Sequence, residues 1–180
     1  MQNLEPKTVW ENFHKLTQVP RPSGHVAAVS RMVAEYGRSL GLETIVEPIG
    51  NVIIRKPATP GYESHPGVIL QGHLDMVPQA DDKNFDFTTM PIETHIEDGW
   101  VLANHTTLGA DNGIGVATAM AILADNTLKH PAIEAFFTVD EETGMFGAEA
   151  LEAGVLKGHT LLNLDCEAEG ELYIGCAAGV

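Results

Sequence analysis

The chain has 180 residues, which is enough for one domain with its own hydrophobic core. Hydrophobic residues make up 44% of it and charged residues 19%, a balance that excludes a disordered chain. Its formal net charge of −15 disfavours negatively charged partners, so we expect no binding to nucleic acid and none to an anionic membrane.

The spacing of apolar residues predicts two helices at the start of the chain, over residues 6–18 and 24–40. Strands and helices then alternate. We expect strands at 43–46, 51–54, 68–71, 133–139, 160–164 and 171–175, and helices at 111–124 and 147–153. A polar insertion over 80–107 contains a predicted hairpin around Asp98-Gly99. This alternation predicts an α/β fold, a layered sheet with helices on both faces.

The two ends of the chain and its cysteines bear on the cellular location and on the length of the natural protein. The first residues, MQNLEPKTVW, lack the basic leader and apolar run of a secretory signal. No apolar stretch approaches the ~18 residues of a membrane-spanning helix. Two cysteines, Cys166 and Cys176, fit a reducing cytoplasm. The last residues, ELYIGCAAGV, look like a strand entering a glycine turn, so we expect a truncated piece of a longer protein.

Four acidic or histidine-containing motifs occupy similar places in the predicted elements, just after a strand or at the start of a helix. They are Gly72-His-Leu-Asp75, Leu108-Gly-Ala-Asp-Asn-Gly-Ile-Gly115, Asp140-Glu-Glu-Thr-Gly144 and Asn163-Leu-Asp165. In open α/β sheets the loops beyond the carboxyl ends of the strands converge on one crevice. The motifs are therefore expected to meet.

Each residue type suits one role in a two-metal hydrolase. His73 offers an imidazole nitrogen to zinc, and Asp75 can accept the other ring N–H and fix the tautomer. Asp111 can bridge two cations, with Asp165 on one metal and Glu142 on the other. Glu141 is adjacent to a ligand and free to act as general base towards a zinc-activated water.

Each motif alone has an ordinary structural explanation. The pair Glu141-Glu142 could be a solvated helix start, and Asp165 could cap a turn. The glycines near Asp111 could only mark turns, since no phosphate loop ending in Gly-Lys-Ser/Thr is present. Four such motifs in this order favour the metal site.

At these residues the chain resembles the di-zinc peptidase superfamily of carnosinase-type dipeptidases, aminoacylases and glutamate-releasing carboxypeptidases. Among its branches the chain is most similar to the aminoacyl-histidine dipeptidases. The resembling stretches lie at residues 50–57, 70–79, 106–115 and 169–175. The resemblance implies the phosphorylase/hydrolase-like catalytic domain of zinc peptidases, and residues 1–180 would be its N-terminal part. A lid and dimerisation domain and the C-terminal half would be absent.

The resemblance also implies a set of ligands. His73, Asp111 and Asp165 would hold one zinc, and Asp111, Glu142 and a further histidine the second, with Co²⁺ or Mn²⁺ as possible substitutes. No residue of this chain matches that histidine. The peptide between Asp111 and Asn112 would be cis, next to the flexible Gly113.

The resulting hypothesis is metal-dependent hydrolysis of dipeptides, in particular Xaa-His, with Glu141 as base. By resemblance we expect a small dipeptide substrate and a homodimer of the full-length protein, and the cysteine count favours a cytoplasmic location. Two alternatives stay open: an N-acyl-amino-acid deacylase with the same two metals, and an inactive fragment. We expect the isolated 180 residues to bind zinc weakly and to turn over little substrate.

Overall fold

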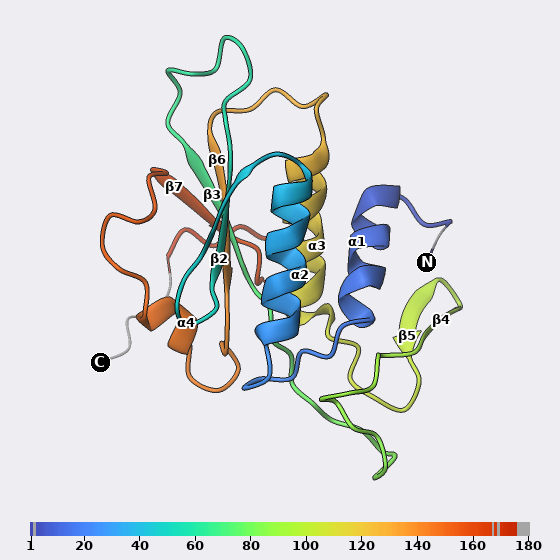
Figure 1. Cartoon of the computed structure of the whole chain (residues 1–180). Coiled ribbons are helices and arrows are strands. Elements are labelled where there is room, and N and C mark those ends of the chain that lie inside the picture. The colour runs from blue at the N-terminus through green and yellow to red at the C-terminus, as the bar shows by residue number, and fades with distance from the viewer. Residues whose placement is uncertain (2, 167, 169, 176–180) are drawn as a thin grey trace.

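The computed structural model describes residues 1, 3–166, 168 and 170–175 (Figure 1). In chain order its elements are α1 (Lys7–Thr17), α2 (Ala27–Ser39), β1 (Glu43–Val46), β2 (Val52–Lys56), β3 (Val68–His73), β4 (Thr94–Glu97), β5 (Trp100–Ala103), α3 (Ala110–Ala124), β6 (Ile133–Thr138), α4 (Phe146–Glu149) and β7 (Thr160–Asn163). The predicted alternation of strands and helices is confirmed, and the fold is α/β.

A five-stranded sheet with the order β1-β2-β6-β3-β7 forms the centre of the fold. β3 pairs in parallel with both β6 and β7, whereas β2 runs antiparallel to β1 and β6. The register places Gly72 opposite Phe137 and Gln71 opposite Asn163, so β3, β6 and β7 end at the same edge. The loops beyond that edge carry the predicted site.

Three helices, α1, α2 and α3, lie on one face of the sheet (Figure 1). Their apolar sides form the main core together with inward-facing strand residues. Its members include Phe13, Leu16, Val29, Val33, Val52, Ile54, Leu70, Met120, Leu123 and Phe137. Alternate residues of the same strands, Ile53, Ile69 and Phe136, form a smaller cluster on the opposite face. The segment that begins with α4 covers it through Leu151, Val155 and Leu156. β6 is buried along its whole length because both faces are covered.

The hairpin predicted within residues 80–107 is present as β4 and β5. Both turn residues, Asp98 and Gly99, have positive φ, at 49° and 84°. Two such residues match the twist of the flanking strands, which explains the tight connection.

Two predicted elements differ in the structure. The helix expected over 147–153 is shorter, because after Glu149 the chain turns so that Leu151 can pack on the smaller cluster. The strand expected over 171–175 is wrong: those residues form no strand. Leu172 is 94% exposed, and no strand in the described part of the chain lies beside it to accept its backbone hydrogen bonds.

Two further sequence features concern the cysteines and the membrane. Cys176 lies outside the described residues, so the structure does not test whether the two cysteines stay reduced as expected. Among the residues that the structure describes, none of the helices has the length and apolarity to span a membrane.

Candidate metal centre

The residues predicted from the motifs lie around one edge of the sheet. His73 is the last residue of β3 and Asp75 follows it, the Asp140–Glu142 turn follows β6, and Asp165 follows β7. Asp111 is in the first turn of α3, which packs beside β3. The chain thus brings together groups almost a hundred residues apart, as the strand-end argument predicts.

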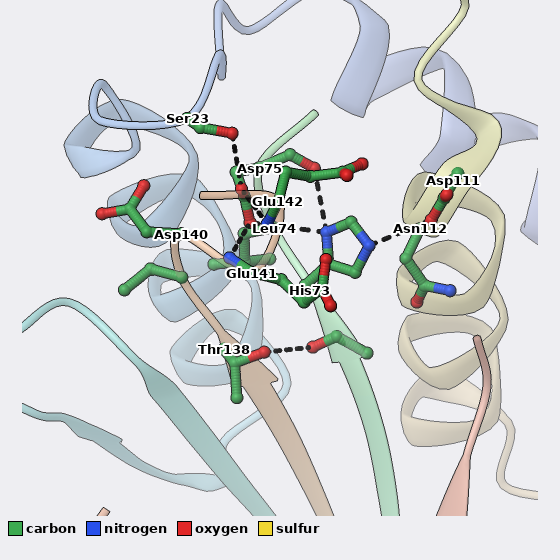
Figure 2. Close-up of polar contacts among 12 residues, drawn as sticks. Ser23, His73, Leu74, Asp75, Asp111, Asn112, Thr138, Asp140, Glu141 and Glu142 are labelled. Atoms are coloured by element: carbon green, nitrogen blue, oxygen red, sulfur yellow. Dashed lines mark hydrogen bonds and ion pairs between the residues drawn. The ribbon is translucent and has the colours of Figure 1, made fainter. Parts of the chain in front are cut away.

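The His73 ring is at the centre of this group (Figure 2). Its Nε2 lies 3.0 Å from Asp111 Oδ1 and 3.8 Å from Asp165 Oδ2. One donor atom each from His73, Asp111 and Glu142 lies within 4.8 Å of the other two. His73 is buried and Asp111 is exposed, so the group opens to solvent on the side of α3.

Asp75 orients the ring, although not quite as the sequence predicted. His73 Nδ1 lies 3.1 Å from the backbone carbonyl of Asp75 and 3.4 Å from its carboxylate Oδ1. We therefore assign one ring proton to Nδ1, donated to Asp75, so that Nε2, which faces Asp111, is the nitrogen available to a metal (Figure 2). An imidazole that binds a metal through one ring nitrogen donates its other N–H to a protein group in this way.

The Asp75 carboxylate also fixes the turn after β6. It is fully buried and accepts hydrogen bonds from the backbone N–H of Glu141 (3.1 Å) and of Glu142 (3.3 Å), and from the Ser23 hydroxyl (2.7 Å). Burial acts to raise the pKa of Asp75, but His73, Ser23 and the Glu141 amide outweigh it and lower the pKa to about 2. Asp75 is therefore an anion that ties β3 to the Asp140–Glu142 turn.

The start of α3 is kinked at the predicted bridging residue. Asp111 has non-helical φ and ψ of −80° and 117°, and the peptide between Asp111 and Asn112 is cis, which confirms the expectation from the resemblance. The Asn112 amide donates to the carbonyl of Leu164 (2.8 Å) and to Asp165 Oδ1 (2.9 Å). Asn112 thus connects α3 to the loop after β7.

The carboxylates crowd one another. Burial and the nearby Asp111 carboxylate raise the pKa of Glu142. Burial also raises the pKa of Asp165, and Asp111 adds to this effect while His73 opposes it. Burial opposes the charge of His73, yet Asp75, Asp165 and Asp111 raise its pKa to about 9. In the described part of the chain, the Glu141 carboxylate accepts no hydrogen bond.

These residues fit a divalent metal centre. Donors bound to one ion at about 2.0–2.2 Å lie no more than ~4.4 Å apart, and the observed spacing needs only small shifts to satisfy that. Imidazole nitrogen and carboxylate oxygen are both ligands that divalent metals such as zinc take in proteins. A cation there would also relieve the repulsion that raises the pKa of Glu142 and Asp165.

Three side chains that support this centre were not predicted from the sequence: Arg21, Ser23 and Asn112. The first two belong to the segment PRPSG at 20–24, which reads as a helix breaker. The available signal was an arginine enclosed by two prolines, Pro20 and Pro22, in a loop with no other reason to be rigid.

Comparison with known proteins gives three findings. Residues 69–177 match the family described as peptidase family M20/M25/M40. The chain is 44% identical over 181 residues to the cytosol non-specific dipeptidase of Escherichia coli, covering 100% of this chain and 37% of the relative. The crystal structure of aminoacylhistidine dipeptidase from Vibrio alginolyticus is similar at 49% identity with a TM-score of 0.94, over 97% of this chain and 36% of that one.

A more distant structure shares the fold. The Bacillus subtilis YXEP protein, described as a dinuclear metal-binding peptidase of the M20 family, matches 86% of this chain and 41% of its own, at 19% identity and a TM-score of 0.58. The present chain thus spans little more than a third of the two closely similar relatives.

Proposed function

This chain belongs to peptidase family M20/M25/M40, and on that premise we propose that it supplies most of the active site of a metal-dependent dipeptidase acting on Xaa-His dipeptides. The substrate class is suggested by the names of two relatives, the aminoacylhistidine dipeptidase of Vibrio alginolyticus and the non-specific dipeptidase of Escherichia coli. Because those names differ in specificity, the preference for a C-terminal histidine is the finer part of the proposal.

The observation that carries the proposal is the convergence on His73. An imidazole oriented by Asp75 lies within 3.0 Å of Asp111 and 3.8 Å of Asp165, and a Glu142 oxygen completes a group within 4.8 Å. A site built only for stability would pair each carboxylate with its own cationic side chain, whereas here the carboxylates share the single His73 ring and raise one another's pKa.

We propose two Zn²⁺ ions as the resident metals, with Co²⁺ or Mn²⁺ as substitutes. His73, Asp111 and Asp165 would hold one, and Asp111 and Glu142 would contribute to the second. When bound, two such ions would polarise a scissile carbonyl and lower the pKa of a water molecule. The description of the YXEP protein as a dinuclear metal-binding peptidase supports the number of ions.

The chain's own residues then move the proton. Glu141, next to the ligand Glu142, accepts a proton from the attacking water and passes it to the leaving amine. Asp75 holds the backbone of both glutamates through their N–H groups, so the base and the ligand keep a fixed relation to His73. Geometry of this kind is what makes general-base catalysis effective.

The size of the relatives bears on the rest of the protein. We propose that residues 1–180 are the N-terminal part of the catalytic domain, and that a lid domain, the C-terminal half and a further metal-binding histidine belong to the complete enzyme. The complete enzyme would be a cytoplasmic homodimer that binds neither nucleic acid nor membrane. The word cytosol in the name of the Escherichia coli relative supports the location, and the net charge of −15 supports the absence of binding to nucleic acid and to anionic membranes.

The test is release of free histidine from β-alanyl-histidine and a panel of Xaa-His dipeptides by the longest natural chain that contains these residues. We expect cleavage that EDTA abolishes and added zinc restores. Glu141→Gln should reduce kcat about 10²–10⁴-fold with metal still bound. Glu152→Gln, the same change at an exposed residue, is the matched control and should leave kcat unchanged.

The possible outcomes separate the parts of the proposal. Cleavage of N-acetylated amino acids in place of dipeptides would keep the site and replace the substrate class with that of a deacylase. Full activity of the Glu141→Gln variant would refute the role of the base. Activity that persists after metal removal would refute the metal centre.

A further inference from the structure

The segment Arg21–Gly24, which we name the clasp, follows α1 and lies against the loop after β3. Its backbone pairs with that loop: Met76 N–H donates to the Arg21 carbonyl (3.1 Å), and Ser23 N–H donates to the Met76 carbonyl (3.3 Å). Pro22 and Met76 thereby form an isolated parallel bridge. The clasp therefore runs beside the stretch that contains Asp75.

The Arg21 side chain connects two of the loops that bear proposed ligands. It is only 2% exposed. Its Nη1 donates to the carbonyls of Leu74 (2.9 Å) and Asp75 (3.2 Å), and its Nη2 donates to the carbonyl of Gly109 (2.5 Å). One planar guanidinium thus links the loop after His73 to the loop before Asp111.

Two glycines, Gly109 and Gly113, leave the space that the Arg21 guanidinium occupies. A Cβ atom added at Gly109 would lie 2.5 Å from Arg21 Nη2, and one at Gly113 would lie 2.7 Å from it. Gly109 also has a positive φ of 69°. Both glycines belong to the motif that contains Asp111, so the motif is shaped around the arginine.

The rest of the clasp reaches the third loop and Asp75. The Ser23 hydroxyl donates to Asp75 Oδ2 at 2.7 Å, and the Gly24 N–H donates to Asp140 Oδ1 at 2.6 Å. Asp140 precedes Glu141 and Glu142 and has a positive φ of 54°. Three loops, after β3, before α3 and after β6, are therefore held by four consecutive residues.

Burial of the charged Arg21 side chain costs free energy, because the guanidinium loses its hydration. Well-packed apolar residues usually replace a buried ionic group without loss of stability, so packing alone does not explain Arg21. Burial lowers the pKa of Arg21 to about 10, against the effect of Asp75 and Asp111, and the group stays protonated at neutral pH. The positive charge of Arg21 thus lies close to the carboxylates of Asp75 and Asp111. The N–H groups of its planar guanidinium hold three backbone carbonyls in place.

We propose that the clasp positions the metal centre, with Arg21 as its principal positioning residue. Its guanidinium sets the separation of His73 from Asp111, and Ser23 holds the carboxylate that orients His73. This inference rests on the proposed metallopeptidase function and adds residues that never touch metal or substrate. Its effect should be measurable as metal affinity, apart from any activity.

The experiment compares zinc binding by the metal-free complete protein and its variants, by calorimetric titration in competition with a chelator. Arg21→Lys keeps the charge but loses the fork, and Arg31→Lys makes the same change at an exposed position of α2. We expect Arg21→Lys to weaken zinc binding about 10–100-fold and Arg31→Lys to leave it unchanged. With zinc in excess, kcat of Arg21→Lys should fall while KM changes little.

A purely structural role would give another pattern. It would lower the melting temperature of Arg21→Lys but leave its zinc affinity within about three-fold of wild type, and that result overturns the proposal. If the Arg21 variant does not fold, Ser23→Ala and Ser23→Thr decide. We expect a loss of about ten-fold in zinc affinity for alanine and recovery for threonine, which keeps the hydroxyl. Full affinity of Ser23→Ala would likewise overturn the clasp.

The wild-type titration separates this inference from the function on which it rests. Wild-type protein that binds none of zinc, cobalt and manganese overturns both. Wild-type protein that binds two ions, with variants that bind them equally well, overturns the clasp alone.

Discussion

Replacement of Glu134 by glutamine should destabilise the protein far more than the same change at Glu43, although both carboxylates bind Arg55. Glu134 lies in β6 with its side chain 7% exposed. It accepts from Arg55 Nε at 2.9 Å and from the backbone N–H groups of Lys157 and Gly158, each at 2.7 Å. Glu43 binds Arg55 at 2.7 Å, but its side chain is 60% exposed.

The expected magnitude follows from these contacts. A hydrogen bond to a charged group contributes about 1.5–3 kcal/mol and one between neutral groups about 0.5–1.5 kcal/mol. The single carbonyl oxygen of glutamine can keep the two backbone donors, but its amide then faces Arg55 donor to donor. We therefore expect Glu134→Gln to lower the free energy of unfolding by about 2–4 kcal/mol. An exposed ion pair contributes about 0–1 kcal/mol, which sets the expectation for Glu43→Gln.

The assay is urea unfolding of the longest natural chain that contains these residues, at neutral and at acidic pH. Burial acts to raise the pKa of Glu134, but Arg55 and the two backbone amides outweigh it and hold the pKa below its usual value of 4.5. A lowered carboxylate pKa contributes stability above the unfolded value and loses it as the pH falls through the folded value. The difference between wild type and Glu134→Gln should therefore shrink once the pH drops below about 4.5.

Two results would refute this reasoning. A loss smaller than about 1 kcal/mol at neutral pH would mean that the three contacts of Glu134 add little to stability. Equal losses for Glu134→Gln and Glu43→Gln would mean that burial does not decide the strength of the two ion pairs.

Three further predictions concern other parts of the structure. Asp75→Asn should lower kcat/KM about 10–100-fold in the dipeptidase assay, because the amide cannot accept from both His73 and the glutamate turn. Gly147→Ala should lower the melting temperature, with a loss of about 1–3 kcal/mol, because the new Cβ would lie 2.5 Å from the Val139 carbonyl oxygen; Gly175→Ala, which meets nothing, is the control. Lys56→Met should lower the free energy of unfolding by about 1–2 kcal/mol in urea titrations, because Lys56 Nζ donates to the carbonyls of Ile122 and Asp125 at the end of α3.

The positions of the proposed ligands could be inferred from the sequence, because a general rule of α/β sheets places them. His73 ends a short apolar strand, Asp140–Glu142 and Asp165 each follow one, and the carboxyl ends of parallel strands share an edge. No such rule places Arg21, whose carbonyl partners lie 53, 54 and 88 residues further along the chain. Its contacts depend on tertiary packing that leaves no periodic trace in the sequence.

The two predicted elements that differ in the structure, the strand at 171–175 and the helix at 147–153, do so for the same kind of reason. The run from Leu172 to Ile174 is apolar and suits a strand, but a strand forms only beside another strand, and none in the described part of the chain is available there. Residues 150–153 have helix-forming composition, but Leu151 gains more by packing on the sheet than by extending α4. In both places the environment outweighs the local preference of the residues.

The order of the strands also has a consequence for biosynthesis. β6 lies between β2 and β3 but is made after both of them, and after α3. A nascent chain that ends before residue 133 thus carries two apolar strands with unpaired edges, one edge of β2 and both edges of β3, and the pairing that joins them is remote in sequence. We expect such chains to depend on chaperones or to aggregate, and β2 and β3 to be joined in one sheet only when the ribosome has released β6.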